Sequence, residues 1–211
     1  MNIKFTVYIS NIKHGSSHLL TNDSINELDS IFVTSEKMRY IPITHSEAVK
    51  AAVKTAEEQE GPALYIPGYV QLTIDNNEIF TEDDWTTDIL MTWKGFSLLL
   101  DREYFDSFSK EDEINITLLD NQTECMITNL GKDIQLKIDR FLMPEIEDTT
   151  IDINTIENTI FESPLIPKEV FLNAIKEELE NVFIFLQSNE LFKEDSSYET
   201  ILEIYDDISK K

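Results

Sequence analysis

The chain contains 211 residues, of which 41% are hydrophobic and 10% aromatic, so it can bury a core, and extensive disorder is excluded. Acidic residues outnumber basic ones by 41 to 17, which gives a formal net charge of −24. A field of this sign repels nucleic acid phosphates and anionic lipids and attracts basic proteins, although acidity also keeps ordinary proteins in solution. The charge therefore argues against direct binding of nucleic acid or membrane and favours a basic protein partner.

Cys125 is the single cysteine, which excludes an intramolecular disulfide and a cysteine-based zinc site. The first 17 residues are too few and too polar for a signal peptide, and no later stretch offers the roughly 18 consecutive apolar residues of a membrane span. We therefore expect a cytoplasmic protein.

Apolar and polar residues alternate over Ile3–Ser10, which predicts a half-buried strand, and Arg39–Ile43 is expected to form a second strand that ends or lies at an edge. Small apolar residues then recur at helical spacing. They predict a helix over Ala48–Ala56, capped by Ser46 with a contribution from His45, and ended by the Gly61-Pro62 pair.

The stretch Tyr65–Tyr104 holds both tryptophans and is expected to form the centre of an antiparallel sheet. Within it, Asp75–Glu78 predicts a hairpin turn, because asparagine tolerates positive φ. Trp85–Trp93 fits both strand and helix spacing. A helix is favoured, because Thr81 or Asp83 can cap it and Gly95 can end it.

Further strands are predicted from apolar patterns. Phe96–Leu100 is a continuous apolar run, expected to be a buried strand, and Ile114–Leu119, Cys125–Asn129 and Ile134–Ile138 read as a meander with one packed face. The polar segment Glu145–Ser163 is predicted to be a surface connection.

Two amphipathic helices are predicted at the C-terminal end. Pro167 suits the first turn of a helix whose apolar stripe runs from Val170 to Leu186, and Ser196 with Glu199 forms a capping box for a last helix. The chain is thus predicted to be an α+β fold, an antiparallel β-sheet or meander covered by helices. We expect one domain over residues 1–211, within which 1–61 can form an N-terminal subregion and 164–211 a C-terminal helical region.

Residues that could carry chemistry are few. His14 and His18 have a metal-ligand spacing only if they lie on a helix, and Gly15 and the adjacent serines favour a loop. Cys125 lies in a predicted strand with no cation beside it, so a buried structural thiol is expected. We expect no catalytic residue, no cofactor and no metal.

The acidic loop Glu82, Asp83 and Asp84, followed by Trp85, is the candidate site. Carboxylates beside an aromatic ring can bind a cation, line a sugar cleft, form a protein-binding surface, or simply face water. Trp85 and Trp93 also suit core positions. Protein binding is the functional interpretation that we carry forward.

Three segments resemble the small acidic immunity proteins that bacteria encode beside polymorphic toxins. They are Gly68–Ile74 with its asparagine turn, Asp88–Trp93, and Ile116–Gln122 with the strand after Gly131, together about a third of the chain. The resemblance implies a non-enzymatic protein that binds a cognate toxin, often a basic nuclease, and covers its active site.

We therefore expect a cytoplasmic immunity or antitoxin protein that neutralises a basic toxin, with Glu82, Asp83, Asp84 and Trp85 as the partner-binding residues. Two alternatives remain open at this point. One is a phage or mobile-element protein that mimics DNA and regulates a nucleic-acid enzyme, and the other is a hydrolase that uses the carboxylates of the acidic loop.

Overall fold

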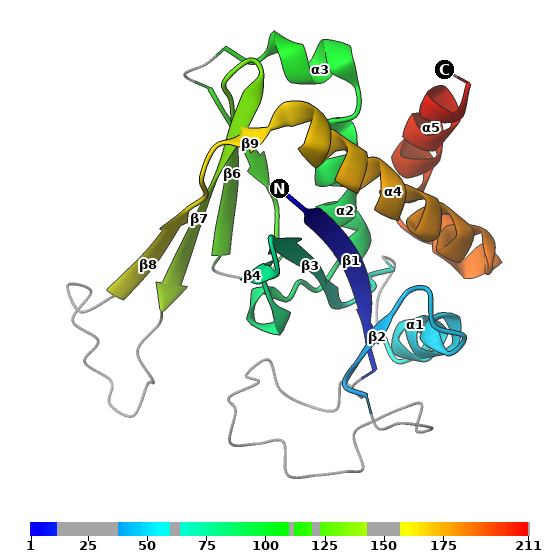
Figure 1. Cartoon of the computed structure of the whole chain (residues 1–211). Helices are drawn as coiled ribbons and strands as arrows, with labels where there is room; N and C mark the ends of the chain where they lie inside the picture. The colour runs from blue at the N-terminus through cyan, green and yellow to red at the C-terminus, as the bar shows by residue number, and fades with distance from the viewer. Residues whose placement is uncertain (12–37, 60–63, 110–111, 120–122, 143–156, 211) are drawn as a thin grey trace.

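Two antiparallel sheets and a set of helices make up the computed structural model, which describes residues 1–11, 38–59, 64–109, 112–119, 123–142 and 157–210 (Figure 1). The elements are β1 (Ile3–Ser10), β2 (Tyr40–Pro42), α1 (Ala48–Glu57), β3 (Gly68–Ile74), β4 (Asn77–Phe80), the 3₁₀ turn η3 (Glu82–Asp84), α2 (Ile89–Leu98), α3 (Arg102–Ser107), β5 (Glu113–Ile116), β6 (Thr123–Asn129), β7 (Asp133–Leu142), β8 (Glu157–Glu162), β9 (Ile166–Pro167), α4 (Lys168–Gln187), the 3₁₀ turn η5 (Glu190–Glu194) and α5 (Tyr198–Ser209). The predicted α+β class with C-terminal helices is confirmed.

The first sheet has the strand order β2-β1-β3-β4, and the second has the order β5-β6-β7-β8, with β9 also paired to β7. Strand β3 is an inner strand, as predicted, and the β5–β6–β7 meander is confirmed. In β1 the side chains of Phe5, Val7 and Ile9 are buried while those between them are more exposed, so the predicted alternation is also confirmed.

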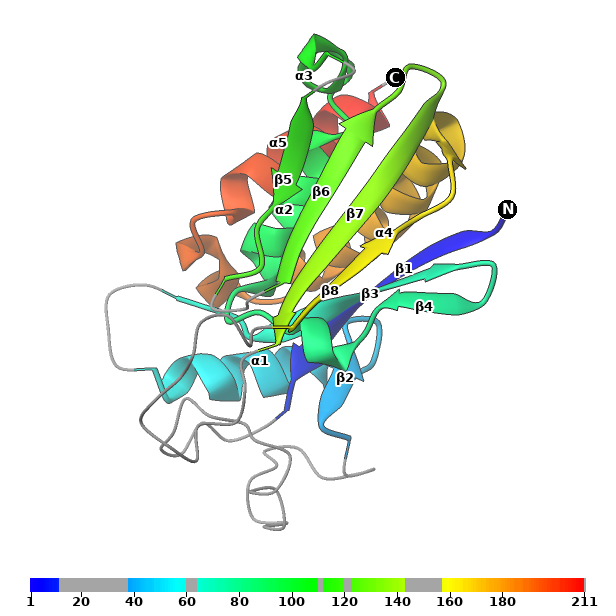
Figure 2. The same cartoon turned by 90° about the vertical axis from the view of Figure 1, so that its left-hand side faces the viewer.

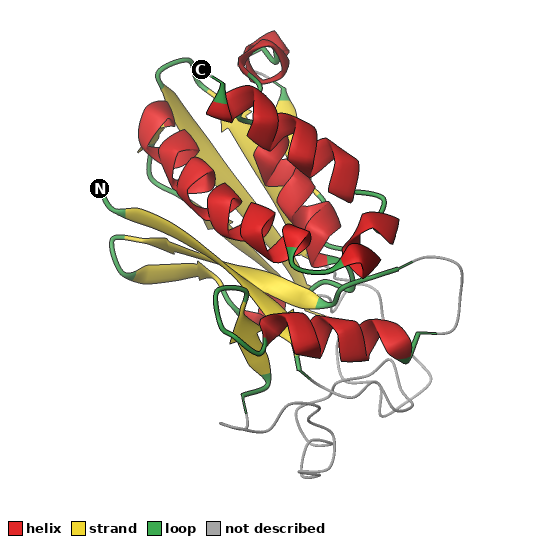
Figure 3. Cartoon of the chain, turned by 90° about the vertical axis from the view of Figure 1, so that its right-hand side faces the viewer, coloured by secondary structure: helices red, strands yellow, loops and turns green. Residues whose placement is uncertain are grey.

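The helices pack on one side of the two sheets, and their apolar faces meet the apolar faces of the strands (Figure 3). Phe5 of β1 contacts Trp93 and Phe96 of α2 and Phe171 of α4, with ring centroids 5.1 to 5.8 Å apart. Buried apolar side chains of both sheets and of α1, α2, α3, α4 and α5 belong to one cluster. Among the described residues, no helix is both long and apolar enough to pass through a membrane.

The turn between β3 and β4 has the predicted chemistry. Asp75 and Asn76 have φ values of 49° and 67°, the conformation that a tight hairpin turn with right-handed twist requires. Short polar side chains tolerate this conformation better than other non-glycine residues do.

The predicted strand Phe96–Leu100 is wrong, because most of this run is the second half of α2. Asp88 caps that helix, since its side chain accepts hydrogen bonds from the backbone N–H groups of Leu90 (3.1 Å) and Met91 (3.2 Å). The helix continues past Gly95, where it was predicted to end. The prediction failed because a short continuous apolar run is compatible with both a buried helix and a buried strand. Thr81 caps η3 instead of α2.

The predicted surface connection Glu145–Ser163 contains an additional strand, β8, which pairs with β7; residues 145–156 of that prediction lie outside the described part. Pro167 precedes the first turn of α4 as its N-cap. The capping box from Ser196 to Glu199 does not form, since Ser197 is the N-cap of α5 and makes no side-chain cap bond.

At the start of α1, Glu47 occupies the N-cap position predicted for Ser46 and provides no side-chain cap. The expected contribution of His45 is confirmed, because its Nδ1 accepts a hydrogen bond from the backbone N–H of Glu47 (3.2 Å). An imidazole nitrogen therefore satisfies one of the donors that a helix leaves unpaired at its N-terminus.

Candidate functional site

The acidic loop connects β4 to α2 and lies where the two sheets meet (Figure 2). Its first turn is fixed by a capping box, in which the hydroxyl of Thr81 accepts from the N–H of Asp83 (3.3 Å) and Asp84 Oδ2 accepts from the N–H of Thr81 (3.0 Å). Its later part pairs with the first residue of β3, because the backbones of Gly68 and Thr86 exchange hydrogen bonds of 3.0 and 2.8 Å. The backbone of the loop is therefore held in one conformation.

Asp84 points inward and has only 1% of its surface exposed. Both of its carboxylate oxygens accept hydrogen bonds from the guanidinium group of Arg140 at 2.7 Å, and Thr123 donates a further bond of 3.1 Å. This bidentate ion pair joins the loop to β6 and β7. The carboxylate of Asp84 is thus a buried structural group, and it is not available to a partner.

The other predicted contact residues have different positions. Glu82 and Asp83 are exposed, and Trp85 is half-buried. Trp93 is completely buried against Phe5 and Phe96, so its core interpretation is confirmed. The predicted site is therefore reduced at the surface to Glu82 and Asp83, with part of Trp85.

Three tyrosines lie on the face of the first sheet that points away from the helices. Tyr8 of β1 is directly opposite Tyr69 of β3, and their rings stack with centroids 4.6 Å apart and planes within 3° of parallel. Tyr40 of β2 meets Tyr69 edge-on at 5.0 Å. This cluster was not predicted as a site. Tyr8 and Tyr40 are partly exposed, whereas Tyr69 between them is buried, with 8% of its surface exposed.

Polar and acidic groups surround the tyrosines. The hydroxyl of Tyr8 donates to Gln71 Oε1 (3.3 Å), and Gln71 Nε2 donates to Glu78 Oε1 (2.8 Å). Burial raises the pKa of Tyr40, the positive charge of Arg39 lowers it, and the nearby carboxylates of Glu82 and Asp83 raise it. The carboxylates of the loop therefore lie close enough to the tyrosines to act on them electrostatically.

We call this region the acidic tyrosine surface; it consists of Tyr8, Tyr40, Tyr69, Gln71, Glu78, Glu82 and Asp83. It combines aromatic rings that are already packed together with carboxylates that face water. Tyrosine contributes a large apolar area with a polar end, and few rotatable bonds are lost when it is covered.

The outer face of the second sheet adds to the negative charge on this side of the molecule. Figure 2 views that face with α2, α4 and α5 behind it. Five acidic side chains of the described strands occupy its outward positions, and the basic residue among them is Lys137; the acidic residues are Glu113, Glu124, Asp133, Asp139 and Glu162.

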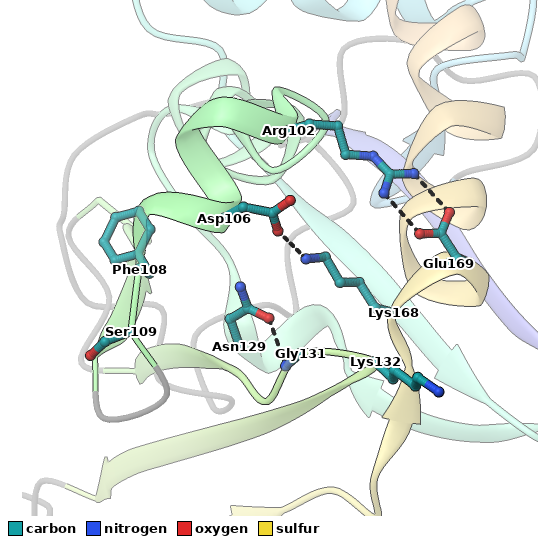
Figure 4. Close-up of a pocket in the computed structure, with 9 residues that line it drawn as sticks. All are labelled: Arg102, Asp106, Phe108, Ser109, Asn129, Gly131, Lys132, Lys168 and Glu169. Atoms are coloured by element: carbon teal, nitrogen blue, oxygen red, sulfur yellow. Dashed lines mark hydrogen bonds and ion pairs between the residues drawn. The ribbon is translucent and has the colours of Figure 1, made fainter.

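The larger of the two pockets described here has a volume of about 690 Å³ and lies between α3, the β6–β7 turn and the start of α4 (Figure 4). Arg102 and Lys168, two of the three cationic side chains that line it, are already paired. Arg102 makes two hydrogen bonds of 2.8 and 2.9 Å to Glu169, and the ammonium group of Lys168 binds Asp106. The same Lys168 nitrogen lies 4.5 Å from the centre of the Phe105 ring. These pairs connect α3 to α4, so the pocket is interpreted as a structural junction.

The two chemical candidates predicted from the sequence, Cys125 and the pair His14 and His18, have different outcomes. Cys125 is fully buried, and burial raises the pKa of its thiol well above the ordinary value, which confirms the expected structural thiol. Within the described residues, no group of three or more His, Cys, Asp or Glu side chains is placed to hold a metal ion. His14 and His18 lie outside the described residues.

Comparison with protein-family models, with curated proteins and with solved structures gave no match in any of the three cases. No residue role is therefore transferred from a relative, and the functional argument rests on the geometry of this chain.

Proposed function

We propose that this protein is a non-enzymatic, cytoplasmic immunity or antitoxin protein that neutralises a basic toxin by binding it through the acidic tyrosine surface. The observation that carries the proposal is the placement of Glu78, Glu82 and Asp83 beside the packed tyrosines on a sheet face turned away from the helices. A toxin that acts on nucleic acid needs a positively charged site to hold phosphates, and this surface is complementary to it.

The rigidity of the surface supports binding without large rearrangement. The tyrosines are held by strand pairing and by each other, and the loop is held by its capping box and by the Asp84–Arg140 pair. A surface that is ordered before binding loses little conformational freedom when it is covered, so more of the contact energy appears as affinity.

The alternative functions have no comparable feature in their favour. A hydrolase based on the acidic loop would have to work without Asp84, whose oxygens are occupied by Arg140 and Thr123. The DNA-mimic alternative rests on the net charge alone.

The proposal is tested by co-expressing this protein with the product of the neighbouring gene. Rescue from toxicity and co-purification of the two proteins are expected. The double substitution Glu82→Lys with Asp83→Lys should weaken rescue, whereas Glu203→Lys with Asp207→Lys, which makes the same charge change on exposed positions of α5, should leave rescue largely intact. Toxicity that persists despite soluble wild-type protein, or the absence of a toxic neighbouring product, would contradict the proposal.

A further inference from the structure

Two buried carboxyl groups meet between α2 and the C-terminal end of the chain. Asp88 is the N-cap of α2 and is 1% exposed; Asp195 lies between η5 and α5 and is 4% exposed. Each uses Oδ1 to cap local backbone, since Asp88 accepts from Leu90 and Met91, and Asp195 accepts from the N–H of Ser197 at 2.7 Å. These bonds fix the orientation of both carboxyl groups.

The two carboxyl groups lie within hydrogen-bonding reach of each other. Asp195 Oδ2 is buried without a hydrogen bond, and the neighbouring hydroxyl of Ser197, which lowers the pKa of Asp195, is also buried without one. Two ionised carboxylates have only acceptors, so they cannot bond to each other and would repel at this distance. When one of the two groups is protonated, it can donate a hydrogen bond to the other.

We propose that Asp88 and Asp195 form a proton-dependent latch that docks the C-terminal segment, Glu190–Ser209, onto α2. With one shared proton the latch is closed, and its loss leaves two buried negative charges that push the segment away. The C-terminal segment is the part that yields, because its main contacts are with α2 and α4, whereas α2 is held in the core by Trp93 and Phe96.

Burial and the neighbouring charge of Asp88 raise the pKa of Asp195 to about 7, and burial also raises the pKa of Asp88. The pair therefore binds its proton more tightly in the folded chain than in the unfolded chain. The docking that depends on this proton is complete at acidic pH and is lost as the pH rises through about 7.

The other charged groups around the pair do not replace the proton. Lys94 of α2 acts on Asp88 and lowers its pKa, but less than burial raises it. Lys193 and Glu194 of η5 and Glu199 of α5 are exposed, so water screens their charges. On the α4 side the packing is aromatic, with Phe185 stacked on Phe192 of η5 at 4.6 Å.

The latch also has a connection to the candidate surface. Asp88 ends the loop that begins at Thr81 and carries Glu82 and Asp83, so the negative charge left when the proton is lost lies at the end of that loop, while α2 keeps its position. This consequence for partner binding rests on the proposed function, whereas the latch itself does not.

The test is hydrogen exchange of the α5 amides in the isolated full chain, corrected for the intrinsic effect of pH on exchange. In the wild type, protection in α5 should be about tenfold lower at pH 8.5 than at pH 6. Asp195→Asn, whose amide donates a hydrogen bond at every pH, should show nearly constant protection, and Glu194→Gln, a neighbouring exposed change, should behave as the wild type does. Constant protection in the wild type, or an unchanged pH response in Asp195→Asn, would overturn the latch.

A second measurement needs no variant. Carboxyl-carbon NMR of the wild-type chain should show Asp88 or Asp195 titrating near neutral pH. If both carboxyl groups titrate only in the ordinary acidic range, the latch is excluded. Neither measurement includes a partner, so failure of the latch is distinguishable from failure of the proposed binding function.

Discussion

At the residue scale, the neighbouring carboxylates Asp83 and Asp84 have opposite roles. Asp83 is exposed beside the tyrosines. Asp84 is buried and accepts hydrogen bonds from Nε and Nη2 of Arg140. A buried ion pair of this geometry is compensated only while both partners are present. The loop therefore offers its negative charge from Glu82 and Asp83, and its position depends on Asp84.

Replacing Arg140 by alanine should leave Asp84 as an uncompensated buried charge. The free energy of unfolding is expected to fall by about 3–5 kcal/mol, the range found when one partner of a buried pair is removed. Urea denaturation measures this free energy of unfolding. Lys137→Ala on the outward face of the same strand is the control and should change stability by less than about 0.5 kcal/mol. A loss for Arg140→Ala as small as that of the control would mean that the pair does not hold the loop.

The buried Asp88–Asp195 pair predicts a pH-dependent difference in stability. Because the pKa of Asp195 is raised to about 7 in the folded chain, its stabilising proton is lost as the pH rises through neutrality. Asp195→Asn should therefore be more stable than the wild type at pH 8.5, by on the order of 1–3 kcal/mol, and the difference should shrink towards zero as the pH falls to about 4, the pKa of an aspartate in the unfolded chain. If Asp195→Asn and the wild type have equal denaturation midpoints at pH 8.5, the Asp88–Asp195 pair does not destabilise the folded chain at that pH.

The sequence identified the acidic loop but could not assign its individual residues. Asp83 and Asp84 are chemically identical neighbours, and their roles differ because Arg140, 56 residues later, lies beside only one of them. The same limit applies to the tyrosines, which come from three strands and meet only after the sheet has formed. Long-range pairing decides both cases.

At the element scale, the contact between β1 and β3 supports the acidic tyrosine surface. Gly68 begins β3, and a Cβ atom placed there would lie 2.0 Å from the carbonyl oxygen of Tyr8. Since that oxygen belongs to the backbone, no side-chain rotation can relieve the contact. Only glycine allows the two strands to approach closely at this end of the sheet.

Gly68→Ala is therefore expected to force the strands apart and lower the free energy of unfolding by more than about 2 kcal/mol, with loss of the Tyr8–Tyr69 stacking. Thermal unfolding and near-ultraviolet circular dichroism measure the two effects. Gly131→Ala is the comparison, since a Cβ there meets nothing within 4 Å and the change acts only through its φ of 90°, at about 1 kcal/mol. If Gly68→Ala is as mild as Gly131→Ala, the close approach is not required.

Local patterns predicted the elements that have a clear period. The strand Ile3–Ser10, the meander and the long helix α4 follow directly from alternation or from an apolar stripe. The continuous run after Trp93 has no such period, and a cap at Asp88 together with burial on several sides makes it helical. The strand β8 was not predicted, because its sequence is polar. It pairs with β7, and this long-range contact leaves no local pattern in the sequence.

At the scale of the whole molecule, the net charge of −24 predicts that the proposed association with a basic partner depends on ionic strength. Raising the salt from about 0.05 to 0.5 M should lower the association rate constant by at least about tenfold and change the dissociation rate much less. Surface kinetics with the co-purified partner measure both constants. A salt effect confined to dissociation would contradict electrostatic steering.

The most direct test of the binding surface is carbodiimide labelling of carboxylates in the free protein and in its complex with the co-purified partner. Glu78, Glu82 and Asp83 should be modified in the free protein and protected in the complex, while Glu203 and Asp207 on α5 should be modified equally in both. This result is predicted if the acidic tyrosine surface covers the basic toxin. Protection of Glu203 and Asp207 with continued labelling of Glu78, Glu82 and Asp83 would contradict the account.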